Sequence, residues 1–68
     1  MRLKELRKQR NITQTKLAMD LNMNQNSISR YETGEHEADY ATLIMFADYF
    51  DVSIDYLLER TNNPKLNK

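Results

Sequence analysis

Cysteine is absent from the 68 residues of this chain, and glycine and proline occur once each. Without cysteine the chain can form neither a disulfide framework nor a thiolate metal site. The scarcity of glycine and proline disfavours an all-β fold, because tight turns between strands depend on these residues. No apolar run approaches the length of a membrane span and no secretory leader is present, so we expect a cytoplasmic protein without membrane contact.

The length allows one small domain, near the lower limit for a core that folds without disulfides or metals. The formal net charge is zero, but the charges are unevenly distributed. Residues 1–30 hold seven Lys or Arg and two acids, whereas residues 31–68 hold three Lys or Arg and eight acids. The basic half can present a positive surface to phosphates, although these charges would also suit ordinary solvated helix faces.

The most informative segment is residues 13–34, TQTKLAMDLNMNQNSISRYETG, which predicts two short helices joined by a tight turn. Its apolar residues repeat at helical spacing in two groups, Leu17, Ala18 and Leu21, then Ile28 and Tyr31. Between the groups, Asn22 can adopt the left-handed conformation that ends a helix, and Asn24 can cap the next one. Ala18 is small where the two helices would cross most closely.

The outer face of the second of these helices is polar, with Gln25, Asn26, Ser29, Arg30 and Thr33. Gln and Asn amides can pair with adenine in the major groove, and Arg can pair with guanine. A buried face that fixes the crossing angle and a polar face suited to the major groove indicate a helix-turn-helix. We therefore predict base contacts from Gln25, Asn26, Ser29 and Arg30; the alternative is a solvated face without a ligand.

This segment resembles the Cro/CI-type (xenobiotic-response-element) family of bacterial and phage repressors. Family members typically have Gln, Ala, Gly and Ile at the positions held here by Gln14, Ala18, Asn22 and Ile28. MRLKELRKQRNIT is similar to the family's first helix and entry loop, and YATLIMFADYFDVSIDYLLERTNNP to its last two helices. The resemblance covers roughly residues 1–64. It implies an all-α fold, a compact five-helix bundle of the lambda-repressor-like DNA-binding type.

Within this bundle the second and third helices form the helix-turn-helix. We expect a DNA-binding domain over residues 1–58 and a short tail over residues 59–68 that is frayed around Pro64. The first helix is predicted from about Arg2 to Arg10, with Leu3 and Leu6 inward and Arg2, Lys4 and Lys8 outward. Asn11 is a candidate left-handed residue after it, and Ile12 fills the junction with the next helix.

Capping residues mark the other helix starts. Thr13 is expected to cap the second helix, but Lys16 stands where the family often has the Glu of a capping box. The third helix should start after Asn24 and end before Gly34. Asp39 and Ser53 should cap the last two helices. Their predicted inward residues are Leu43, Ile44, Ala47 and Phe50, then Ile54, Leu57 and Leu58.

Phosphate contacts are predicted for Gln14, Ser27, Lys16 and Arg10. Gln14 occupies the family's phosphate-contact position at the start of the second helix; otherwise it is a first-turn residue without a partner. The resemblance also implies a structural ion pair between Arg7 and Glu32 that locks the third helix to the first. In the family the loop at 35–39 often contacts phosphate through Lys or Arg, so Glu35 and Glu37 make such a contact doubtful here.

No metal site and no cofactor are expected. His36 lies among acids, but nothing supplies convergent ligands of fixed geometry, so a solvated loop is the simpler interpretation. Tyr40, Met45, Phe46 and Tyr49 are read as core or interface packing. An enzyme is disfavoured because the single histidine comes without cysteine, a glycine-rich loop or clustered carboxylates.

The function expected from these features is sequence-specific binding of double-stranded DNA by a small transcriptional regulator. We expect a repressor acting as a homodimer on a pseudo-palindromic operator, with the third helix in the major groove. The candidate dimer interface is Ile54, Tyr56 and Leu57 with the preceding loop. The alternative is an antitoxin-like or other protein-interaction module that binds a protein partner and for which DNA binding is secondary. The sequence shown can also be part of a longer chain.

Overall fold

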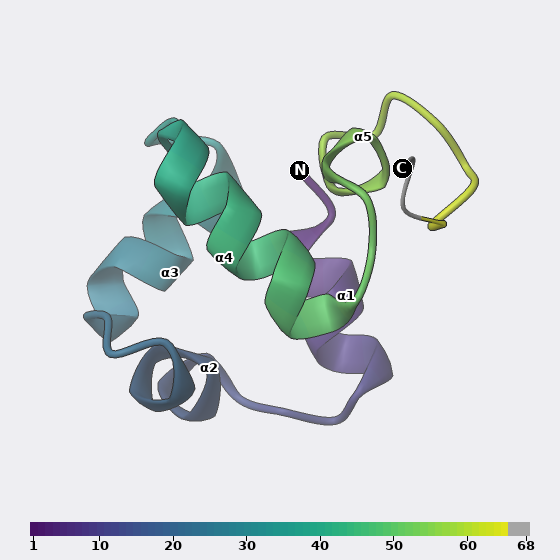
Figure 1. The fold of residues 1–68 in the computed structure, drawn as a ribbon. Helices are drawn as coiled ribbons and strands as arrows, with labels where there is room; N and C mark the ends of the chain where they lie inside the picture. Colours follow the sequence, from purple (N-terminus) through teal and green to yellow (C-terminus); the bar gives the residue numbers. More distant parts are fainter. Residues whose placement is uncertain (66–68) are drawn as a thin grey trace.

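The structure, a computed structural model, describes residues 1–65 and shows five helices without a strand in this range. They are α1 (Leu3–Gln9), α2 (Gln14–Asp20), α3 (Gln25–Thr33), α4 (Tyr40–Phe50) and α5 (Ile54–Leu57). Figure 1 shows α4 lying across the bundle, with α1 behind it and α2 and α3 on the opposite side from α5. The predicted all-α five-helix bundle is confirmed. No helix of residues 1–65 is long and apolar enough to cross a membrane.

Side-chain caps start the last four helices, as predicted from Thr13, Asn24, Asp39 and Ser53. Each cap oxygen accepts a hydrogen bond of 2.8–3.0 Å from a backbone N–H two or three residues further along. These bonds satisfy donors that the first turn of a helix leaves without intrahelical partners. The first helix is shorter than predicted, because Arg2 and Arg10 are its non-helical flanking residues.

Left-handed backbone conformations end the early helices where the sequence predicts them. Asn11 has φ 56°, Asn22 has φ 54° and Gly34 has φ 81°. The turn between α2 and α3 is closed by a hydrogen bond from the Met23 N–H to the Ala18 carbonyl at 2.8 Å. Asparagine tolerates this region better than most residues but still has a side-chain penalty that glycine lacks.

Asn22→Gly is therefore expected to be tolerated or to stabilise the fold by roughly 0.5 kcal/mol. Relief of strain at φ 54° should outweigh the greater freedom of glycine in the unfolded chain. Asn22→Ala is the matched control and should destabilise by about 1 kcal/mol. Thermal melts compare the three chains. A clear drop in melting temperature for Asn22→Gly would show that the Asn22 side chain has a role of its own.

The cap of α4 makes stability depend on acid pH. Hydrogen bonds from the side chain and backbone of Thr42 hold the pKa of Asp39 below its ordinary value of 3.8. A carboxylate with a lowered folded-state pKa stabilises the fold above its unfolded pKa and loses that contribution as pH falls through the folded value. Asp39→Asn keeps a capping oxygen but cannot titrate.

We expect Asp39→Asn to melt close to the native chain at neutral pH and to lose stability less steeply below about pH 4. Asp39→Ala, which removes the cap, should melt lower at neutral pH. Melting temperatures across this pH range test both expectations. Parallel curves for the native chain and Asp39→Asn would rule out Asp39 as a source of the acid sensitivity.

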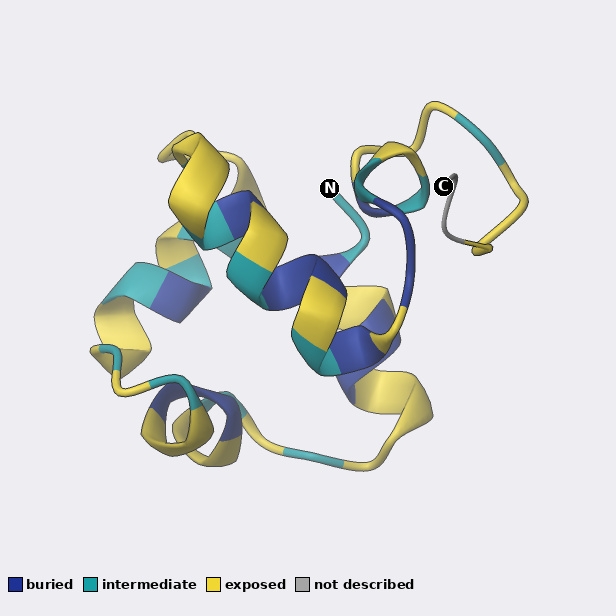
Figure 2. Cartoon of the chain, in the orientation of Figure 1, coloured by how far each residue is buried: buried dark blue, intermediate teal, exposed yellow. Residues whose placement is uncertain are grey.

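One hydrophobic core joins all five helices (Figure 2). Its buried residues are Leu3, Leu6, Leu17, Ala18, Ile28, Leu43, Phe46, Ala47, Phe50, Val52 and Leu57. In the predicted inward stripe of α4 only Ile44 is wrong, because it is 48% exposed. Phe46, which was read as core or interface packing, is wholly buried in the core. On a helix, one face is shared by positions 43, 46, 47 and 50. Position 44 lies to the side of that face.

The inward side of α5 also differs from the prediction. Leu58 is 40% exposed because the helix ends at Leu57, and Val52 fills the core from the preceding loop instead. Leu57 is wholly buried, so its predicted place in a dimer interface is wrong. Ile54 and Tyr56 are half-buried and remain reachable from outside.

The predicted outward orientation of Arg2 is wrong as well. Its Nε donates to the Tyr56 carbonyl at 2.8 Å, and its guanidinium carbon lies 4.4 Å from the centre of the Tyr56 ring. Its Nη2 donates to the Thr61 carbonyl and to Asn62 Oδ1. The Ser53 N–H donates to the Pro64 carbonyl at 2.9 Å. Residues 61–64 are thus held against the bundle and not frayed, whereas residues 66–68 of the predicted tail lie outside the described residues.

Candidate nucleic-acid interface

A tightly packed pair of helices, α2 and α3, carries the polar face. Leu17 and Ile28 are wholly buried between the pair and the rest of the core, and Ala18 of α2 is buried as well. On the other side of α3, Gln25, Asn26, Arg30 and Thr33 are exposed, while Ser27 and Ser29 are half-buried. The fold therefore presents the predicted base-contact residues along one surface of a helix whose opposite side is fixed by packing.

Arg30 is the cation of this polar face. Its side chain forms no hydrogen bond or ion pair with residues 1–65, although its backbone carbonyl accepts from Thr33 Oγ1 at 3.2 Å. An exposed guanidinium keeps all its donors available to a ligand. The side chain can thus meet an acceptor outside the protein without breaking an internal contact.

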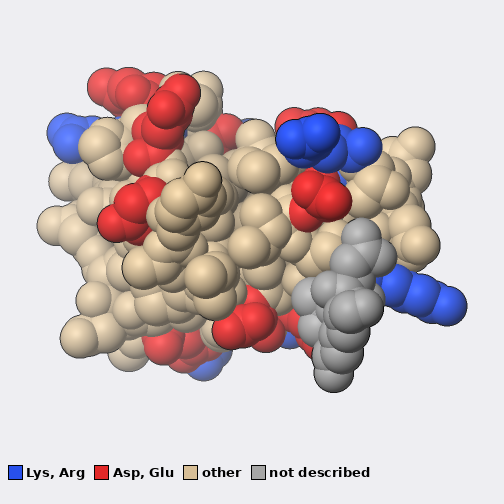
Figure 3. All heavy atoms as spheres, turned by 45° about the horizontal axis from the view of Figure 1, so that its top comes forward, with Lys and Arg blue, Asp and Glu red and all other residues tan. Residues whose placement is uncertain are grey.

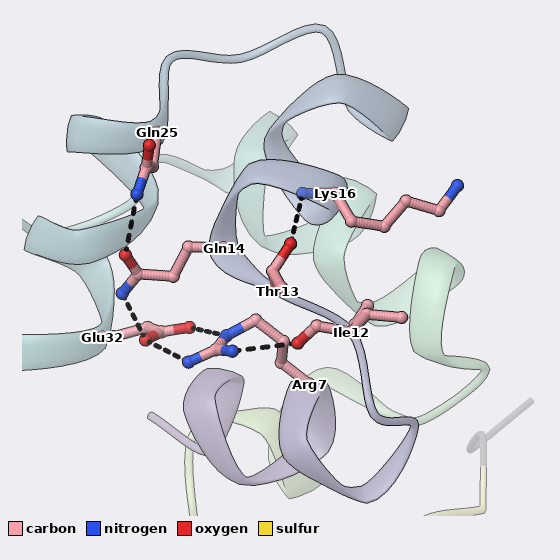
Figure 4. A network of polar contacts seen from close by, with 7 residues as sticks. All are labelled: Arg7, Ile12, Thr13, Gln14, Lys16, Gln25 and Glu32. Atoms are coloured by element: carbon pink, nitrogen blue, oxygen red, sulfur yellow. Dashed lines mark hydrogen bonds and ion pairs between the residues drawn. The ribbon is translucent and has the colours of Figure 1, made fainter.

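Beneath α3 lies a buried ion pair that connects it to α1 (Figure 4). Arg7 Nε and Glu32 Oε2 are 2.7 Å apart, and Arg7 Nη2 donates to Glu32 Oε1 at 3.2 Å. Arg7 Nη1 donates to the Ile12 carbonyl at 2.9 Å. The Glu32 side chain is only 3% exposed. This two-point contact fixes both the position and the rotation of α3 relative to α1.

Gln14 extends this network toward the surface. Its Nε2 donates to Glu32 Oε1 at 2.9 Å, and its Oε1 accepts from Gln25 Nε2 at 3.5 Å. Figure 4 shows the resulting chain from Arg7 through Glu32 and Gln14 to Gln25, the first residue of α3. The Gln14–Glu32 bond could not be predicted from the sequence, because the residues are 18 positions apart and no local spacing links them.

The predicted phosphate contacts lie in different surroundings. Lys16 is exposed and pairs with Asp20 at 2.9 Å, and Tyr49 Oη donates to the same carboxylate at 2.6 Å. The hydrogen bond from Tyr49, followed by that from Lys16, lowers the pKa of Asp20. Bonding to Asp20 raises the pKa of Lys16 and of Tyr49. This cluster ties α2 to α4 and keeps a cation at the side of α2.

Arg10 is not brought together with the polar face. Its guanidinium donates to the carbonyls of Tyr49 and Phe50 at 3.1 and 2.9 Å and lies over the Phe50 ring. These bonds satisfy carbonyls at the C-terminal end of α4, where a cation is favoured by the helix dipole. Arg10 thus stabilises the scaffold here, and a phosphate contact from it stays a prediction.

The acidic loop after α3 gives no sign of a metal site. The His36 ring packs 5.3 Å from the Tyr31 ring, and its backbone N–H donates to the Arg30 carbonyl. Within residues 1–65 there is no group of three or more His, Asp or Glu side chains placed to hold a metal ion. The loop follows the C-terminal end of α3 and borders the polar face there.

Comparisons with known proteins agree with this geometry. A family model described as helix-turn-helix matches residues 3–57. The uncharacterized HTH-type transcriptional regulator YqaE of Bacillus subtilis (strain 168) is 42% identical over 64 residues, 94% of this chain and 55% of its own length. The HTH-type transcriptional regulator ImmR of the same organism is 37% identical over 67 residues, 98% of this chain and 53% of its own length.

The chain spans about half the length of these curated relatives. No solved structure matches it significantly. The family model nevertheless covers most of the chain, including every helix, and its limits coincide with the first residue of α1 and the last residue of α5. The chain belongs to the Cro/CI-type helix-turn-helix family.

Proposed function

We propose that this chain binds double-stranded DNA sequence-specifically, with α3 in the major groove, and regulates transcription as a repressor. The observation that carries the proposal is the exposed polar face of α3 on a helix pair whose other side is fixed by packing and by the Arg7–Glu32 pair. An α-helix with its base-reading side chains on one face fits the width of the major groove. The names of the relatives support the regulatory role.

In this proposal each part of the face has its own task. Gln25 and Asn26 present amides at the N-terminal end of α3, the end that contacts base edges in helix-turn-helix proteins. Arg30, one turn further, reaches a guanine. Gln14 and Lys16 on α2, with Ser27, face the phosphate backbone and set the register of the protein on the duplex.

A homodimer completes the proposed DNA complex. Two copies related by a two-fold axis would place their α3 helices in successive major grooves, about 34 Å apart, on a pseudo-palindromic operator. The surface of α5 with Ile54 and Tyr56 is the proposed contact between the copies, and each of these residues is half-buried in the single chain.

Selection of bound sites from randomised duplex DNA tests this function. We expect enrichment of an inverted repeat with half-site centres about 10 base pairs apart. A chain carrying Gln25→Ala, Asn26→Ala and Arg30→Ala is the matched control, because all three side chains are exposed and the core is untouched. If the native chain enriches no motif, or if the control enriches the same one, the proposed interface is wrong.

A further inference from the structure

An apolar strip of α4 lies open on the surface, away from the packing that buries the rest of the helix. Tyr40 is 84% exposed and Ile44, one turn further, is 48% exposed. On a helix these two positions are neighbours, so they form a continuous strip. Large apolar side chains grouped in this way on a small domain mark an interaction site more often than scattered ones do.

Beside this strip runs a groove between α4, the loop after α3 and the start of the chain. It has a volume of about 410 Å³, and its lining includes Met1, Tyr31, His36, Ala38, Leu43 and Leu58. Ala38 and Leu43 also line an adjoining hollow of about 320 Å³ next to Tyr40. The hollows share Ala38 and Leu43, and Tyr40 of the strip lines the second hollow. We call the hollows and the strip together the α4 groove, defined by Leu58, Leu43, Ala38, Tyr40 and Ile44.

Acidic side chains border the α4 groove. Glu37 lines the groove and Asp39 lines the adjoining hollow, and Glu35 comes from the same loop. At the other end Glu59 follows Leu58, and its carboxylate pairs with the N-terminal ammonium of Met1 at 3.5 Å. Figure 3 shows an uncharged surface on this side of the molecule, with acidic groups and also Lys or Arg side chains at its margin. Lys and Arg are scarce in the half of the sequence that builds most of this region, residues 31–68, which has a net excess of acids. The acidic loop at this end of the groove therefore disfavours nucleic acid and anionic lipid as its occupant.

The acidic residues beside the α4 groove disfavour a second copy of the chain as its occupant. A two-fold contact places the same patch of both copies face to face, and would set the acidic borders against each other. Seven of the ten Lys and Arg residues lie in the first 30 positions, on other elements. Pairing them with the α4 groove of another copy would be head-to-tail, and such contacts need not close into a dimer.

We propose that the α4 groove binds a basic amphipathic helix of a partner protein, independently of DNA. Apolar residues of that helix at i, i+3, i+4 and i+7 would lie along Leu43, Tyr40 and Ile44, in the helix-in-groove mode. Lys and Arg beside that stripe would face Glu35 and Glu37, which adds specificity and speeds association. The proposal goes beyond DNA binding, because none of the groove-defining residues belongs to the polar face of α3.

A designed peptide tests the proposal on the chain as it exists. The probe is a fluorescein-labelled helix of about 15 residues with Leu at i, i+3, i+4 and i+7 and Lys or Arg flanking them. We expect fluorescence anisotropy to show binding that weakens with added salt. Ile44→Ser and Tyr40→Ser should each weaken it about tenfold. Glu37→Lys should also weaken it and should reduce the salt dependence.

Met19→Ser is the matched control, since Met19 is an apolar residue 74% exposed on α2, outside the groove. It should leave peptide affinity unchanged, and every variant should keep its helical dichroism and its affinity for the selected DNA site. The proposal is overturned if the native chain does not bind the peptide, or if an acidic peptide with the same Leu pattern binds equally well. Equal affinity of the groove variants and the control would also overturn it. The oligomeric state, measured by sedimentation, gives a further test. If Ile44→Ser converts a dimer into a monomer, the groove is the contact between two copies and the proposal is wrong.

Discussion

Arg7→Ala is expected to lower the free energy of unfolding by roughly 3 kcal/mol. The Glu32 side chain is only 3% exposed in the native chain, and the substitution removes the cation that pairs with it. It also removes the hydrogen bond that Arg7 Nη1 donates to the Ile12 carbonyl. The amide of Gln14 still donates to Glu32, but a neutral donor cannot replace the charge of a guanidinium. Removing one partner of a buried pair costs more than the intact pair contributes to stability, because the other charge stays buried.

Urea unfolding of three variants isolates this effect. Lys8→Ala, at the next and exposed position of α1, should change stability little. The double change Arg7→Met with Glu32→Gln should be milder than Arg7→Ala, because no unpaired charge is left behind. If Arg7→Ala instead keeps full stability and reduces DNA affinity, Arg7 contacts phosphate and its structural role is wrong.

Arg30→Ala should weaken binding to the selected DNA site by about 1–3 kcal/mol and relax discrimination at one base position. The exposed guanidinium has no internal partner among residues 1–65, so its loss should leave the stability of the fold unchanged. The salt dependence of binding should decrease slightly if the charge also lies near phosphates. Titrations against the selected site and its single-base variants at several salt concentrations give all three quantities.

Gln14→Ala should behave differently. It should weaken binding to specific and non-specific duplexes by similar factors and leave the salt dependence nearly unchanged, because a neutral amide releases no counterion. The hydrogen bond from Gln25 to Gln14 is long, at 3.5 Å, and exposed, so its loss should change base preference little. If Gln14→Ala alters base preference while Arg30→Ala weakens every sequence equally, α3 lies on the DNA in another orientation.

Local signals in the sequence predicted the helices well because helix ends depend on neighbouring residues. Thr13 and Asn24 cap helices through bonds to residues two or three positions away, and Asn22 adopts its left-handed conformation within a short turn. The apolar period likewise identified most of the core. It failed for Ile44, because α4 has apolar residues at nearly every position and only packing decides which of them turn inward.

The partners of long polar side chains could not be predicted from the sequence. The side chain of Arg2 reaches residues 54 to 60 positions away, and that of Arg10 reaches 39 and 40 positions away. No periodicity within a helix predicts such partners, so both were assigned to the surface or to phosphate. The polar face of α3 could be predicted from the sequence because it depends on local helical spacing. Ile28 is buried, so the residues on the opposite side of the helix are exposed.

Methylation interference with the selected duplex tests the central claim most directly, because dimethyl sulfate modifies guanine N7 in the major groove and adenine N3 in the minor groove. If α3 reads the major groove, methylation of particular guanines should block binding of the native chain, and methylation of adenines between the half-sites should not. In Arg30→Ala the interference should vanish at one guanine of each half-site and persist at the others. Interference confined to adenine N3, or an identical guanine pattern for both chains, would contradict the account.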